Sequence, residues 1–155
     1  MNVYILCGLI GSGKSTWAKE KAKESNTVII NKDNIRSMLK GDYVFHKDLE
    51  PLVKEIAYDS ILESVFKNFD VIIDETNLTK KHRADYISLI KSHYKDKNIK
   101  INIVYFTEKE NNVDRRMNDP KGQSREVWQK VHFDMLRVFE EPTSDEADNL
   151  IIVAE

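Results

Sequence analysis

The sequence contains little of what disulfide-bonded, collagen-like or membrane-spanning proteins require. Its 155 residues include one cysteine, three prolines and five glycines, which excludes an internal disulfide and a glycine- and proline-rich repeat. No apolar run approaches the roughly 20 residues that cross a bilayer as a helix. The first residues also lack the basic, apolar and small-residue succession of a signal peptide. We therefore expect a cytoplasmic protein with no membrane partner.

The chain also lacks an excess of charge of one sign. Its formal net charge is −2, so the surface as a whole does not attract polyanions, and any contact with nucleic acid must be local. Hydrophobic residues make up 41% of the sequence, which is a globular proportion. A chain of 155 residues can bury a core without metals or disulfides, so we expect one domain over residues 1–155.

Short apolar runs alternate with helical patterns along the whole chain. The runs expected to form strands cover residues 3–7, 27–31, 71–73, 99–106 and 150–153. The spacing between them predicts helices over residues 14–22, 33–40, 49–65, 79–94, 109–117 and 124–140. This alternation predicts an α/β fold whose mostly parallel five-stranded sheet is covered by helices on both faces. A polar segment at about 117–124 is expected to form a short lid.

A glycine-rich segment follows the first predicted strand and opens the first predicted helix. It fits the pattern G-x-x-x-x-G-K-[ST] in full. Its glycines let the backbone wrap around a polyphosphate, which then faces successive N–H groups and the positive end of the helix. Lys14 is expected to reach the β- and γ-phosphates and Ser15 to bind Mg²⁺. The residues predicted to bind ATP here are Gly8, Leu9, Ile10, Gly11, Ser12, Gly13, Lys14, Ser15 and Thr16.

Asp33 and Arg36 follow the second predicted strand, at the edge of the sheet where ligands of open α/β folds collect. A carboxylate at this place can accept the proton of an attacking hydroxyl, and an arginine three residues later can bind an acceptor phosphate. The alternative is that Asp33 caps the N-terminus of the helix that begins there. From the residues alone, both roles stay open.

The third predicted strand ends in Asp74, Glu75, Thr76 and Asn77. An acid that directly follows a buried strand is the usual partner of a glycine-rich phosphate loop and holds Mg²⁺, so Asp74 is the better metal candidate. Thr76 and Asn77 are polar residues at the same edge of the sheet. Their alternative role is to form a turn and the start of the next helix.

These segments together resemble the polynucleotide 5′-hydroxyl kinase family. The likeness rests on GSGKSTWA, on NKDNIR, on DETNL followed by Arg83, and on FEEP near the end. It runs from residue 3 to residue 153 and corresponds to the kinase domain alone, without a phosphatase, nuclease or ligase module. The resemblance implies a three-layer P-loop kinase-like fold and transfer of the γ-phosphate of ATP to the 5′-hydroxyl of DNA or RNA, with Mg²⁺ as cofactor.

The resemblance also implies roles for single residues. Asp33 matches the general base of the family and Arg36 its acceptor-binding arginine. Either Asp74 or Glu75 matches its acid, because family members differ by one place there. The remaining residues that the resemblance assigns to acceptor binding are Thr76, Asn77 and Arg83.

The predicted lid departs from the family pattern, which has one arginine in a helix and a second four residues later. Arg115 matches the first and is expected to bind ATP, but Asp119 stands at the second place. An acid cannot neutralise the γ-phosphate, so Arg116, Lys121 or Arg125 must substitute. We expect Arg116 to take this catalytic role. The alternative is that both arginines lie on a solvated helix surface.

Two other functions remain open from the sequence. The first is a kinase of a nucleoside, a nucleotide, a sugar acid or an antibiotic, which the near-neutral charge favours slightly. The second is a regulatory ATPase that transfers phosphate to water, for which Glu75 is the candidate residue that activates the water.

Overall fold

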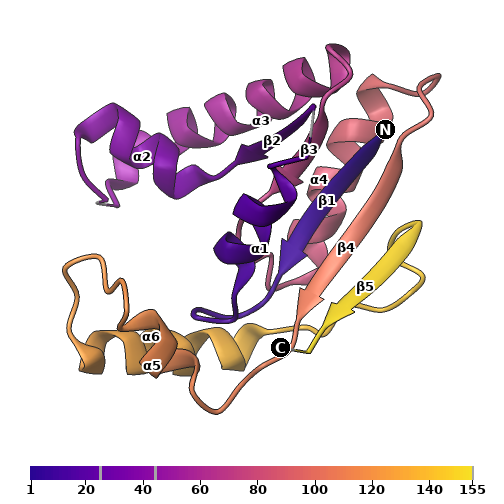
Figure 1. The fold of residues 1–155 in the computed structure, drawn as a ribbon. Coiled ribbons are helices and arrows are strands. Elements are labelled where there is room, and N and C mark those ends of the chain that lie inside the picture. The colour runs from indigo at the N-terminus through magenta and orange to yellow at the C-terminus, as the bar shows by residue number, and fades with distance from the viewer. Residues whose placement is uncertain (25, 44, 155) are drawn as a thin grey trace.

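The computed structural model describes residues 1–24, 26–43 and 45–154. Its centre is a five-stranded sheet with the order β2-β3-β1-β4-β5, in which every neighbouring pair is parallel (Figure 1). The strands are β1 (Asn2–Cys7), β2 (Thr27–Ile30), β3 (Asp70–Ile73), β4 (Lys100–Phe106) and β5 (Asn149–Val153). The predicted α/β class is therefore confirmed, and the predicted strands differ by about one residue at their ends.

The central strands are apolar at nearly every position because both of their faces are covered. Residues 3 to 7 of β1 are all buried, and Val3, Tyr4 and Ile5 pair in register with Val71, Ile72 and Ile73 of β3. One face of the sheet packs against α3 (Glu50–Phe66) and α4 (Lys80–His93), which contribute Ile61, Val65, Tyr86 and Ile90 to the core. The candidate site lies at the carboxyl ends of β1 and β3.

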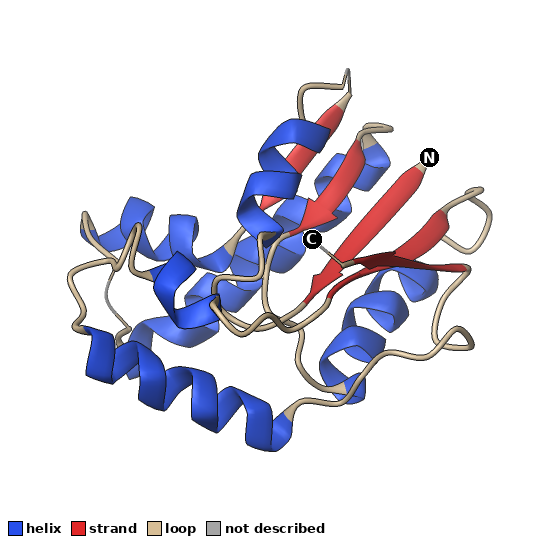
Figure 2. Cartoon of the chain, turned by 60° about the horizontal axis from the view of Figure 1, so that its bottom comes forward, coloured by secondary structure: helices blue, strands red, loops and turns tan. Residues whose placement is uncertain are grey.

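The other face packs against α1 (Lys14–Lys21), whose Ala18 is fully buried among residues of β1, β3 and β4. The half-buried ring of Trp17 meets Tyr4 and Phe106 edge to face. Helix α2 (Lys32–Lys40) packs through Ile35 against Val53 and Ala57 of α3. Helices thus cover both faces of the sheet, as the sequence predicts (Figure 2).

Beyond the carboxyl ends of the strands lie α5 (Asn112–Arg116) and α6 (Arg125–Val138), joined by residues 117–124. A short 3₁₀ helix at Lys47–Leu49 precedes α3. The glycine-rich loop lies directly against α5, because a Cβ atom on Gly11 would come within 2.0 Å of the carbonyl oxygen of Asn112. No helix of the described residues is long and apolar enough to cross a membrane.

Candidate active site

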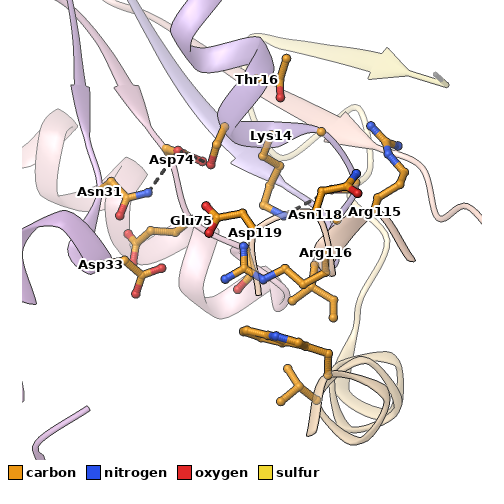
Figure 3. Close-up of a pocket in the computed structure, with 18 of the residues that line it drawn as sticks. Lys14, Thr16, Asn31, Asp33, Asp74, Glu75, Arg115, Arg116, Asn118 and Asp119 are labelled. Atoms are coloured by element: carbon orange, nitrogen blue, oxygen red, sulfur yellow. Dashed lines mark hydrogen bonds between the residues drawn. The ribbon is translucent and has the colours of Figure 1, made fainter. Parts of the chain in front are cut away.

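A cleft of about 820 Å³ opens between the glycine-rich loop, the ends of β2 and β3, and the segment from α5 to α6 (Figure 3). Residues 10 to 16 line its floor. Predicted site residues that line it from other elements are Asp33, Asp74, Thr76, Arg115 and Arg116. Side chains that the sequence predicted to act together therefore meet in one place, although they come from segments far apart in the chain.

The glycine-rich loop wraps around the side chain of Lys14. The Lys14 Nζ atom donates hydrogen bonds to the carbonyl oxygens of Gly8 at 2.9 Å and Leu9 at 2.7 Å. Gly8 and Leu9, the first two residues of the loop, are buried and do not line the cleft. Gly13 is the N-cap of α1 with a φ of 100°, a left-handed conformation that suits glycine. Burial lowers the pKa of Lys14 to about 8, and the charge of Asp74 partly opposes this shift.

Ser15 and Asp74 converge at the expected place for a metal. The Ser15 hydroxyl donates to Asp74 Oδ2 at 3.0 Å, and Asn31 Nδ2 donates to the same oxygen at 3.1 Å. Mg²⁺ typically takes one or two protein oxygens and completes its shell with water and phosphate. A hydroxyl and a carboxylate beside a phosphate loop fit that requirement, so Ser15 and Asp74 are the residues that would hold Mg²⁺.

Glu75 is committed to other partners. Its carboxylate accepts a short hydrogen bond from the hydroxyl of Tyr86, and Lys32 Nζ lies 3.4 Å from its other oxygen. The resemblance left open whether Asp74 or Glu75 matches the acid of the family. In the structure, Asp74 is the one that lies next to Ser15 at the cleft floor. Glu75 joins the end of β3 to the first turn of α2 and to α4.

Asp33 lies in the first turn of α2 and faces the cleft. The N-cap of this helix is Asn31, whose side chain accepts a hydrogen bond from the backbone N–H of Asn34. The alternative prediction, that Asp33 caps the helix, is therefore wrong. Tyr43 lines the cleft together with Asp33, and burial and the charge of Asp33 raise the pKa of Tyr43.

Arg36 holds Asp33 and does not itself line the cleft. Its Nη1 donates to Asp33 Oδ1 at 2.6 Å, while its Nε and Nη2 donate to the two oxygens of Glu50 at 2.9 and 2.5 Å. The hydrogen bonds that Arg36 donates to Glu50 raise the pKa of Arg36, and the same bonds lower the pKa of Glu50. The sequence did not single out Glu50, because it belongs to the next helix.

Two of the residues expected to bind the acceptor have another role. Arg83 is fully buried, pairs with Glu146 at 2.9 Å, and donates to the backbone oxygen of Asn77 at 2.9 Å. Asn77 is 4% exposed and donates to the carbonyl of Leu6 at 2.7 Å. Neither lines the cleft. The prediction that they contact the acceptor is therefore corrected. Both residues stabilise the turn after β3 through these hydrogen bonds, and the buried guanidinium of Arg83 requires such partners.

Thr76 remains at the cleft. It lines the wall beside Asp74, and its backbone oxygen accepts a hydrogen bond from the N–H of Gly8 at 3.0 Å. The bond joins the turn after β3 to the first residue of the glycine-rich loop. The relative position of the two segments is thus fixed by backbone atoms.

The two consecutive arginines of α5 point in different directions (Figure 3). Nη2 of Arg115 lies 3.2 Å from where a Cβ on Gly13 would be, so this side chain covers the phosphate loop. Arg116 extends toward the side of the cleft that carries Asp33 and Glu75. The alternative of a solvated surface pair does not hold, because both side chains are half-buried and line the cleft.

The other candidate cations of the predicted lid are neutralised by neighbours. Lys121 pairs with Asp119 at 3.1 Å and lies over the ring of Tyr43 at 6.0 Å. Arg125 pairs with Asp114 on the exposed side of the segment. Of the three proposed substitutes for the second lid arginine, Arg116 is therefore the one that the structure brings into the cleft.

The fold and this cleft define a P-loop kinase-like domain. Residues 3–142 match the family model described as AAA domain, and the chain belongs to this family.

The chain is also similar to several solved structures. It shares 26% identity with a chain of the Pnkp1/Rnl/Hen1 complex, covering 76% of this chain and 38% of that one at a TM-score of 0.63. A fungal RNA kinase shares 12% identity over 99% of this chain and 74% of its own, with a TM-score of 0.66. The APS kinase CysC of Mycobacterium tuberculosis shares 19% identity over 99% of this chain and 89% of its own, with a TM-score of 0.60. The predicted resemblance to polynucleotide kinases is thus supported at the level of the family and fold.

The chain spans less than half the length of the chains that it matches in the Pnkp1/Rnl/Hen1 complexes, 38% in one and 44% in the other.

Proposed function

We propose that this domain transfers the γ-phosphoryl group of ATP to the 5′-hydroxyl of a DNA or RNA strand. The observation that carries the proposal is that Asp33 lines the same cleft as Lys14, Ser15 and Asp74. A carboxylate in that position can receive the proton of a hydroxyl that attacks the γ-phosphorus. The chain that shares 26% identity belongs to a complex whose second structure is named an RNA repair complex, which supports the same acceptor class.

The donor side neutralises charge. Lys14 and the backbone N–H groups of residues 11 to 15 would hold the β- and γ-phosphates, and Arg115 would cover them from α5. Mg²⁺ held by Ser15 and Asp74 would neutralise phosphate charge when bound. Arg116 would meet the charge on the transferring group from the opposite side. Phosphoryl transfer depends mainly on such positioning and charge stabilisation.

The acceptor side orients the nucleophile. In the reaction a bond forms between the 5′-oxygen and the γ-phosphorus, the bond from that phosphorus to the β,γ-bridging oxygen breaks, and the proton passes to Asp33. Arg36 would act on the acceptor through Asp33, whose carboxylate it holds in position. Tyr43 and the exposed Phe45 line the same side of the cleft and offer rings on which an acceptor base can stack.

A small-molecule acceptor is the second candidate, and the charge of the cleft favours it. The acids that line the cleft match its bases in number: Asp33, Asp74, Glu75 and Asp119 against Lys14, Lys19, Arg115 and Arg116. A long polyanionic strand prefers a cationic surplus. A kinase of a neutral or singly charged metabolite needs no such surplus.

End labelling tests the proposal. The protein is incubated with γ-labelled ATP, Mg²⁺ and two oligonucleotides of the same sequence, one with a 5′-hydroxyl and one with a 5′-phosphate. We expect label on the first only, and its loss in Asp33→Asn. Label on neither strand, while ATP is consumed with a metabolite or with water, would reject the proposal.

A further inference from the structure

Trp128 of α6 forms the face on which the Arg116 guanidinium lies. The Cζ atom of Arg116 is 4.3 Å from the centroid of the indole ring. The ring is 6% exposed, and its Nε1–H donates to the carbonyl oxygen of Pro120 at 2.9 Å. Packing and this hydrogen bond therefore fix the ring, and the fixed ring fixes the plane of the guanidinium.

Arg116 has no acidic partner within the described chain. It forms no ion pair with a described residue, and no atom of the described residues accepts a hydrogen bond from its buried Nε. Its neighbours Lys121 and Arg125 are paired with Asp119 and Asp114. Within the described residues, the charge of Arg116, like that of Arg115, therefore stays available to an anion in the cleft.

The type of contact matters because a carboxylate and an aromatic ring hold an arginine differently. A carboxylate would orient the guanidinium but would also compete with phosphate for its charge and its donors. An indole ring orients the guanidinium through its face and leaves the N–H edge free. A stacked arginine can therefore be held in place before the nucleotide arrives without losing its strength as an anion ligand.

We propose that Trp128 is a positioning residue for phosphoryl transfer: it holds Arg116 over the cleft with its charge unpaired. This inference rests on the proposed function, in which Arg116 acts on the transferring group. It assigns a role to α6, which contributes no residue to the predicted catalytic set.

A double-mutant cycle tests the inference. Trp128→Leu removes the stacking face, and we expect kcat to fall by about three- to thirtyfold, the range of a partly desolvated cation–π contact, with the acceptor KM unchanged. Trp128→Phe keeps an aromatic face and should retain most of the activity. In an Arg116→Ala background, Trp128→Leu should cause no further loss. Phe133→Leu, on the exposed side of the same helix, serves as the matched control and should behave as the wild type.

An equal loss on Trp128→Leu with and without Arg116 would overturn the inference, as would no loss in the wild type. Thermal unfolding of each variant shows whether α6 stays folded.

A second readout does not depend on the acceptor. In a Trp17→Phe protein, Trp128 is the remaining tryptophan, and ATP with Mg²⁺ should change its fluorescence when phosphate binds the free N–H edge of the stacked guanidinium. The change should vanish in Arg116→Ala. An identical change with and without Arg116 would contradict the inference. If the wild type failed to label an oligonucleotide but the fluorescence change that depends on Arg116 was still observed, the proposed function would be rejected and the contact between Trp128 and Arg116 would stand.

Discussion

Arg36 Nη1 donates a hydrogen bond of 2.6 Å to Asp33 Oδ1 across one turn of α2, while Glu50 of α3 binds the other edge of the same guanidinium. The arginine is therefore held on both sides by carboxylates. This arrangement keeps the Asp33 carboxylate directed at the cleft. It gives α3, which has no contact with the cleft, an influence on the proposed base.

Removing the base tests this arrangement first. Asp33→Asn keeps the size of the side chain but cannot accept the proton, so transfer should slow by about 10²–10⁴-fold, the usual contribution of a general base. ATP affinity should change little. Initial rates of label transfer measure the effect, with Asp42→Asn, an exposed acid just beyond α2, as the control. Near-normal turnover in Asp33→Asn would remove this residue from the mechanism.

Arg36 and Glu50 should affect the acceptor more than the donor. Loss of a hydrogen bond to a charged group costs about 1.5–3 kcal/mol, so Arg36→Ala should lower kcat/KM for the acceptor by about ten- to a hundredfold. Glu50→Gln should give a smaller loss of the same kind, and Glu55→Gln on the exposed side of α3 should give none. Steady-state kinetics with each substrate varied in turn separate the two sides. An equal loss of ATP affinity would assign Arg36 to the donor site.

Lys14 predicts a pH dependence of ATP binding. Its pKa in the free site is lowered to about 8 by burial, so above that pH the lysine is neutral and must take up a proton when the phosphates bind. ATP affinity should fall by up to about tenfold per pH unit above pH 8, while the phosphates themselves are already ionised, with a second pKa near about 6. The stability of the ATP-free protein should change in the opposite direction. Its free energy of unfolding should rise between about pH 8, the pKa of Lys14 in the folded protein, and about pH 10.4, the pKa of lysine in the unfolded chain.

Calorimetry checks this prediction. Titration of ATP at pH 8.5, about half a unit above the lowered pKa, in two buffers of different ionisation enthalpy should reveal proton uptake. Lys14→Arg keeps its charge in this range and should bind ATP with a flat pH profile. Uptake of the same size in Lys14→Arg would assign the proton to another group.

The Arg83–Glu146 pair should govern stability. Both side chains are buried, at 0% and 4% exposure, and removing one partner of such a pair costs about 3–5 kcal/mol. Arg83→Met should therefore lower the free energy of unfolding by that amount in urea titrations, with an unchanged acceptor KM in the folded protein. Combining it with Glu146→Leu should restore part of the loss. If Arg83→Met raised the acceptor KM and left the stability unchanged, Arg83 would be an acceptor-binding residue and this prediction would be wrong.

The sequence predicts the fold well because the central strands are continuous apolar runs, which periodicity detects without knowledge of their neighbours. The helix predicted over residues 109–117 is shorter, beginning at Asn112. The backbone N–H of Lys109 donates to the side chain of Asn112, the first residue of the helix, at 3.0 Å. This polar stretch has no apolar stripe from which such a boundary could be read.

The site is predictable where its parts are local and unpredictable where they meet across elements. The phosphate loop and Asp74 directly follow the ends of strands, so the neighbouring sequence is enough to predict their position. Arg83 is different: its spacing with Tyr86 and Ile90 on one face of α4 hints at burial, but its partner Glu146 lies 63 residues away. The contacts of Arg36 with Glu50 and of Arg116 with Trp128 join separate helices and likewise leave no local pattern.

The central claim concerns the hydroxyl that receives the phosphate, and one acceptor panel measures it most directly. Transfer from γ-labelled ATP is compared as kcat/KM for a 5′-hydroxyl oligonucleotide, a nucleoside, a sugar acid, adenosine 5′-phosphosulfate and water. We expect the oligonucleotide to be preferred, with label released by removal of its 5′-terminal phosphate. Preference for any of the small molecules, with the oligonucleotide left unlabelled, would contradict the proposed function.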